Sequence, residues 1–224
     1  MTSESTTGVV VTLMPTDPSA TPDAGLRGRA YRLLMRSVAE VTGVPVAEVS
    51  LGREPAGRPV VVGPAEHAHV SLAHTPGLVV AAVSTDGHVG VDAEGPRQVD
   101  TIRLARRWLA VRDVRWLVSL PEEARTEAFL WLWTHKEALG KMAGIGLRGD
   151  SLRAEVPRPD PWRPAEVLPE GRAPELVQGP PSEGATGPDA AWLAAFRTGT
   201  GHQVALAVAA SGSQAPPVQV RSAD

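Results

Sequence analysis

The chain has 224 residues, of which 42% are hydrophobic and 21% charged, and its formal net charge is −3. These values are typical of a soluble globular protein with one or two cores, and the charge gives no reason to expect nucleic acid or an anionic membrane as partner. The absence of cysteine excludes disulfides, thiolate metal sites and cysteine nucleophiles. Because neither a signal sequence nor a membrane-length apolar run is visible, we expect a cytoplasmic protein.

The first hundred residues predict strands with one helix. The polar segment 1–24 contains one short apolar run, 9–14, that suits a strand. Apolar residues recur at spacings of three and four over 25–41, which predicts a helix. Strands are then expected at 60–62, 69–75, 78–83 and 89–94, with a Pro-Gly turn and an Asp-Gly turn between the later ones.

The rest of the chain predicts helices followed by a hairpin. Residues 101–118 and 121–143 have helical patterns, and 153–190 form a Pro- and Gly-rich loop. Strands are expected at 191–196 and 203–209, and the turn around Gly201 resembles the turn around Gly77. We therefore expect an N-terminal half over 25–100, a C-terminal half over 101–211 and a disordered tail over 212–224.

Two predicted elements carry acidic residues that can share one site. Asp92 and Glu94 are two apart on a strand, so their carboxylates face the same side. Glu137 and Lys141 are four apart on the long helix and share a face. Each pattern alone is also compatible with a solvated strand edge or a surface ion pair. Together, three carboxylates and a lysine suit magnesium with a substrate diphosphate, and hence phosphoryl-type transfer.

The two elements resemble the paired motifs of a known family, the 4'-phosphopantetheinyl transferase superfamily in its larger single-chain, surfactin-type form. The segment 90–94, Gly-Val-Asp-Ala-Glu, resembles the first motif, and 133–141, Trp-Thr-His-Lys-Glu-Ala-Leu-Gly-Lys, resembles the second. The segment 57–59 resembles a glycine-lysine-proline element with Arg in place of Lys. The segment 71–75 resembles an asparagine-x-serine-histidine-serine element in which only the histidine is retained.

This resemblance implies an α+β fold of two similar halves in a pseudo-twofold arrangement, with the active site in the cleft between them. It implies that Asp92, Glu94 and Glu137 hold Mg²⁺ and that Glu137 and Lys141 are catalytic. Coenzyme A contacts are expected from a further set of side chains, namely Arg58, His74, Thr75, Lys136 and Lys141.

The activity implied is that of the holo-acyl-carrier-protein synthase type. The phosphopantetheine arm of coenzyme A moves to a serine hydroxyl of an apo acyl or peptidyl carrier protein, and 3',5'-ADP is released. Glu137 accepts the hydroxyl proton, directly or through a water. Two alternatives stay open: a magnesium-dependent diphosphate hydrolase, and an inactive module that binds coenzyme A or carriers. We expect a monomer, and the carrier's pathway (fatty acid, polyketide or nonribosomal peptide) stays undetermined.

A docking surface for the acidic carrier is expected between the two motifs. This segment mixes arginines with large apolar side chains, as interface hot spots do. Its residues are Arg103, Arg106, Arg107, Trp108, Arg112, Arg115, Trp116 and Leu117. A helix with a buried tryptophan face and a solvated basic face is the alternative.

Overall fold

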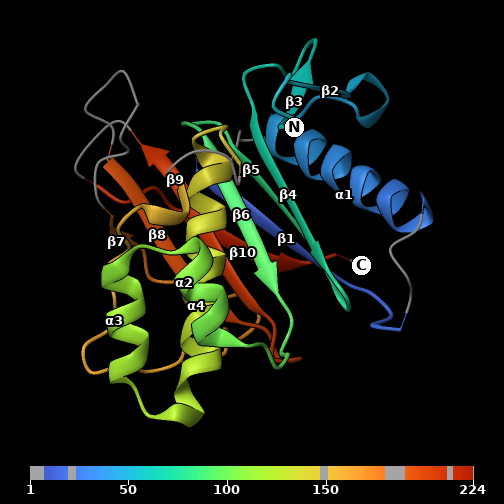
Figure 1. The fold of residues 1–224 in the computed structure, drawn as a ribbon. Helices are drawn as coiled ribbons and strands as arrows, with labels where there is room; N and C mark the ends of the chain where they lie inside the picture. The colour runs from blue at the N-terminus through green and yellow to red at the C-terminus, as the bar shows by residue number, and fades with distance from the viewer. Residues whose placement is uncertain (1–7, 20–23, 147–150, 180–189, 211–213, 224) are drawn as a thin grey trace.

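The computed structural model describes residues 8–19, 24–146, 151–179, 190–210 and 214–223, and shows a mixed α+β fold (Figure 1). The helices are α1 (Ala24–Thr42), α2 (Thr101–Trp108), α3 (Val111–Ser119) and α4 (Glu122–Met142). The strands are β1 (Val9–Pro15), β2 (Ser50–Arg53), β3 (Pro59–Val62), β4 (His69–Thr75), β5 (Leu78–Ser84), β6 (Val89–Glu94), β7 (Val177–Gln178), β8 (Ala190–Arg197), β9 (Gln203–Ala210) and β10 (Val218–Ser222). No helix in the described ranges is both long and apolar enough to cross a membrane.

Most strands belong to two four-stranded sheets. The first sheet has the order β10-β1-β5-β4, in which β1 pairs with β10 in parallel and with β5 in antiparallel orientation. The second sheet has the order β6-β9-β8-β7 and is antiparallel. Strands β2 and β3 form a separate hairpin.

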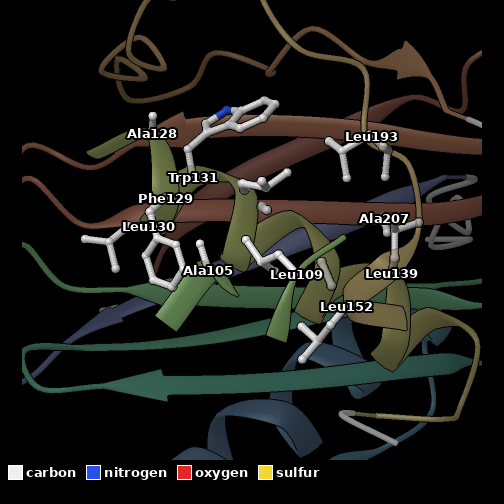
Figure 2. Close-up of a cluster of buried hydrophobic side chains, with 14 of the residues drawn as sticks. Ala105, Leu109, Ala128, Phe129, Leu130, Trp131, Leu139, Leu152, Leu193 and Ala207 are labelled. Atoms are coloured by element: carbon white, nitrogen blue, oxygen red, sulfur yellow. The ribbon is translucent and has the colours of Figure 1, made fainter. Parts of the chain in front are cut away.

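The sheets pack face to face, and each carries helices on its outer face. Alternate residues of β5 face opposite ways, so that Val80 packs between the sheets whereas Val79 packs against α1. On the outer face of the second sheet, Leu139 of α4 meets Leu193 and Ala207 in the cluster shown in Figure 2. The resulting order of layers is α1, first sheet, second sheet, α4.

Strands β4 and β6, from different sheets, meet along a seam held by side chains. The Ser71 hydroxyl accepts a hydrogen bond from the Val91 N–H at 3.0 Å, and the Thr75 hydroxyl accepts one from the Gly95 N–H at 3.3 Å. The seam therefore brings the two motif-bearing segments of the N-terminal region next to each other.

The structure confirms the α+β class, whereas the pseudo-twofold relation of the halves stays a prediction. Two expectations need correction. The expected tail over 212–224 contains β10, which pairs with β1 and so completes the first sheet. The single helix expected over 101–118 is broken at Leu109 and Ala110 into two helices, the first capped by the Asp100 side chain and the second by Asp113.

The expected boundary near residue 100 also does not separate the sheets. Strand β6 precedes that boundary but pairs with β9, and β10 follows both halves but pairs with β1. Each sheet therefore contains a strand from outside the corresponding half of the sequence.

Candidate functional site

Strand β6 presents its two carboxylates toward α4, as the alternation predicts. Val91 and Ala93 are buried between the sheets, and Asp92 and Glu94 lie on the opposite face at intermediate exposure. Gly90 allows the close approach of α4, because a Cβ at this position would lie 2.0 Å from the Ala138 carbonyl oxygen. Any side chain at position 90 would push the helix away from the carboxylates.

Lys141 of α4 makes three hydrogen bonds, two to β6 and one to β4. Its Nζ lies 2.8 Å from Asp92 Oδ1, 2.9 Å from the Val91 carbonyl oxygen and 3.3 Å from the Leu72 carbonyl oxygen. Because Leu72 belongs to β4, the ammonium group bridges the seam between the sheets. On the other side of the site, Arg97 Nη2 lies 3.0 Å from Glu94 Oε1.

Glu137 completes the carboxylate cluster. Burial raises the pKa of the Glu137 carboxyl to about 7, and the Asp92 charge adds to the effect. Burial also raises the pKa of Asp92, against the opposing effect of Lys141. The pKa of Glu94 is raised by burial, and Arg97 opposes the rise. The three carboxylates thus lie close enough to repel one another.

This donor set fits a hard divalent cation. Three carboxylates supply only oxygen ligands, the type that Mg²⁺ prefers, and their mutual repulsion is relieved by added positive charge. Among the described residues, no three His, Cys, Asp or Glu side chains are already arranged around a common metal position. In the structure as it stands, the Lys141 ammonium supplies the positive charge at Asp92.

A cavity of about 730 Å³ adjoins the cluster, and Lys141 belongs to its wall. Five basic side chains and no carboxylates line it; the basic residues are Arg27, Arg53, Arg58, His74 and Lys141. Apolar groups such as Leu26 and Leu72 form the rest of the wall. The cavity therefore suits an anionic ligand with an apolar part.

Arg58 is held at one side of the cavity by contacts from several elements. Its Nη2 lies 2.6 Å from Glu54 Oε1, and its Nη1 donates to the Met142 carbonyl oxygen at 3.4 Å. The guanidinium group lies against Gly144, where an added Cβ would come within 3.2 Å of it. These contacts link the β2–β3 hairpin to the end of α4.

Two residues expected at this site lie elsewhere. Lys136 has no exposed surface, and its Nζ forms an internal ion pair with Asp113 of α3 at 3.0 Å. Thr75 is buried and accepts the hydrogen bond from Gly95 instead of lining the cavity. We therefore withdraw both as coenzyme A contacts, whereas Arg58, His74 and Lys141 do share the cavity.

Sequence reasoning missed two residues of the cavity wall, Tyr31 and Arg53. The Arg53 guanidinium stacks over the Tyr31 ring with 5.3 Å between its carbon and the ring centroid. Tyr31 lies among the arginines of α1, and Arg53 lies in a strand too short to show periodicity. The helix arginines were a visible signal, but only Arg27 among them lines the cavity.

Comparison with known proteins finds similarity to one family. A model of the 4'-phosphopantetheinyl transferase superfamily matches residues 88–182, a range that contains Asp92, Glu94, Glu137 and Lys141. The part of the chain that carries both motifs is thus similar to this superfamily. Curated relatives of the surfactin-type form support the same assignment.

Three relatives illustrate the similarity. The 4'-phosphopantetheinyl transferase psf-1 of Bacillus pumilus is 29% identical over 65% of this chain and 61% of its own length. HetI of Nostoc sp. is 30% identical over 56% of this chain and 55% of its own length. The L-aminoadipate-semialdehyde dehydrogenase-phosphopantetheinyl transferase of Eremothecium gossypii is 28% identical over 69% of this chain and 60% of its own length. The matched part of the chain therefore spans less than two thirds of each of these relatives.

Proposed function

We propose that this protein transfers the 4'-phosphopantetheine arm of coenzyme A to a serine hydroxyl of an apo acyl or peptidyl carrier protein, with release of 3',5'-ADP. One observation carries the proposal: Lys141 lines the basic cavity and also contacts the carboxylate cluster through Asp92. An anionic ligand that enters the cavity can thus extend to the carboxylates. The relatives are named 4'-phosphopantetheinyl transferases, which supports the same transfer activity.

The cavity residues suit the nucleotide and the diphosphate of coenzyme A. Arg58 and His74 would bind the phosphorylated nucleotide end, because a guanidinium group pairs well with phosphate oxygens. Lys141 would donate to the diphosphate, where its charge stabilises the negative charge that grows as the bond breaks. Both roles use residues that the structure places on one cavity.

Asp92, Glu94 and Glu137 would hold Mg²⁺ beside the diphosphate. When bound, the ion neutralises charge on the diphosphate oxygens. Glu137 accepts the proton of the carrier serine hydroxyl, directly or through a water. The new bond joins the serine oxygen to the phosphorus nearest the pantetheine, and the bond from that phosphorus to 3',5'-ADP breaks.

The test incubates the protein with coenzyme A, Mg²⁺ and an apo carrier protein, and then determines the carrier's mass. Transfer predicts a gain of one phosphopantetheine group, and Asp92→Asn serves as the matched control because it keeps the side chain's shape. Cleavage of the diphosphate with an unmodified carrier would support the hydrolase alternative. Coenzyme A binding without any reaction would support an inactive binding module.

A further inference from the structure

His202, the residue just before β9, lies beside Gly95, which follows the carboxylate residue Glu94. It is 6% exposed, and it precedes Gln203, whose backbone pairs with that of Glu94. No step of the proposed mechanism uses this imidazole. Its position therefore calls for an explanation of its own.

Both ring nitrogens of His202 make hydrogen bonds, and these bonds join the two central hairpin turns. Nε2 lies 2.8 Å from the Pro76 carbonyl oxygen, to which it donates, and Nδ1 lies 2.8 Å from the Thr200 hydroxyl, from which it accepts. Pro76 is in the β4–β5 turn and Thr200 is in the β8–β9 turn. The imidazole thus links the first sheet to the second.

The ring also fills the space between two glycines, one in each of the segments that meet at the seam. A Cβ added at Gly77 would lie 3.1 Å from the ring atoms, and one added at Gly95 would lie 3.5 Å from them. Gly77 has a φ of 88°, a conformation that favours glycine. The backbone around the imidazole is thus shaped to receive it.

Gly95 follows the carboxylate residue Glu94, and its own N–H is held by Thr75 at 3.3 Å. Thr75, Gly95 and His202 therefore form a contact set, which we call the latch, that fixes the chain where β6 ends. We propose that His202 is a positioning residue: through the latch it holds Glu94 in the orientation needed for cation binding. This inference rests on the proposed function, since it assigns Glu94 to the metal.

Mn²⁺ is the probe for the test, because free Mn²⁺ is measured directly by electron paramagnetic resonance. His202→Ala is expected to raise the Mn²⁺ dissociation constant about tenfold and to lower kcat by a similar factor, with KM for coenzyme A unchanged. Groups that orient metal ligands typically have effects of this size. His202→Gln, whose amide can still donate toward Pro76, should recover part of the Mn²⁺ affinity and part of kcat. Thr75→Val removes the acceptor for Gly95 and should reproduce the effect even if His202→Ala folds poorly.

A matched control separates positioning from general stability. Ser37→Ala removes a buried hydrogen bond between α1 and β1, in which the Ser37 and Thr12 hydroxyls are 3.0 Å apart, away from the latch. This variant should lose thermal stability without any change in Mn²⁺ affinity. If His202→Ala and Thr75→Val lose stability but bind Mn²⁺ and turn over like the wild type, the positioning role is overturned. If the wild type makes no product and binds Mn²⁺ no better than Asp92→Asn, the proposed function fails, and the inference fails with it.

Discussion

Within the described residues, Glu137 is the member of the carboxylate cluster without an ion pair. Lys141 pairs with Asp92, and Arg97 pairs with Glu94. The remaining negative charge is destabilised by burial and by its neighbours, which is why the pKa of Glu137 rises to about 7. A carboxylate in this state is both an acceptor for a proton and an unsatisfied ligand for a cation.

Glu137→Gln tests both properties, because it keeps the shape of the side chain but removes its charge. We expect kcat for transfer to fall by about 10² to 10⁴, the range typical of a lost general base. Glu127→Gln, ten residues earlier on α4 and paired with Arg197, is the matched control and should retain activity. A decrease of only a few-fold in Glu137→Gln would place the proton acceptor elsewhere.

Substitution of Lys141 should separate its role in catalysis from its role in binding coenzyme A. Lys141→Met keeps the aliphatic stem but removes the donors to Asp92, Val91 and Leu72. We expect kcat to fall about 10²-fold with little change in KM for coenzyme A, because the charge on the diphosphate is larger in the transition state. Steady-state kinetics measure kcat and KM separately. An unchanged kcat with a raised KM for coenzyme A would show that Lys141 binds the ground state and the transition state equally well.

At the scale of elements, two different faces of α4 have different roles, one at the carboxylate cluster and one in the packing against α3. Neighbouring residues on a helix do not face each other, so Lys136 and Glu137 point to different environments. Glu137 faces the carboxylate cluster, and Lys136 pairs with Asp113 of α3. The motif suggested that both residues act at the site. Only the packing of α3 on α4, which the motif does not specify, shows that one of them is structural.

The docking surface proposed for the carrier becomes smaller once α2 and α3 are placed. Trp116 lies among aromatic rings, with its centroid 5.5 Å from that of Trp162 and 6.3 Å from that of Trp131. Leu117 is fully buried, whereas Trp108 is 43% exposed. Trp116 and Leu117 therefore belong to the core, and the exposed arginines with Trp108 remain as the candidate surface.

This surface predicts a specific change in carrier kinetics. The double substitution Arg106→Glu with Arg107→Glu should raise KM for the carrier about tenfold and leave KM for coenzyme A unchanged, and added salt should mimic part of the effect. Arg29→Glu with Arg32→Glu makes the same charge change on exposed positions of α1 and is the control. Trp116→Ala should instead destabilise the fold, on the order of 2 kcal/mol or more. Equal carrier kinetics in the two double variants would exclude α2 from docking.

At the scale of the molecule, helices and strands with a clear hydrophobic period were predictable from the sequence. The contacts between elements that are distant in sequence were not. The alternation in β6 correctly placed Asp92 and Glu94 on one face, and the helical period located α1 and α4. Strand β10 has no such signal, because Val218–Ser222 follows two prolines and gains its partner from β1, some 200 residues earlier in the sequence. The seam and the latch are likewise made of contacts between distant segments.

The opposing titrations of two residues on α4 give the last prediction, which concerns stability against pH. His135 is fully buried, and burial lowers its pKa to about 4, so the unfolded chain takes up this proton near pH 6.5 whereas the folded chain does not. Acidification from pH 7.5 to 4 therefore reduces the free energy of unfolding through His135, by about 3 kcal/mol. Glu137 acts in the opposite direction, because its raised pKa means that the folded chain takes up this proton first.

The metal-free wild type should therefore show a flatter pH profile than either group would produce alone. Glu137→Gln removes the contribution of Glu137 to the pH dependence and leaves that of His135. This variant should be more stable than the wild type at pH 7.5, where the charged carboxylate is repelled by Asp92, and should lose stability more steeply toward pH 5. Urea unfolding in the presence of a chelator, at several pH values, measures both curves. Parallel curves for the two proteins would mean that Glu137 is not the strained carboxylate of the cluster.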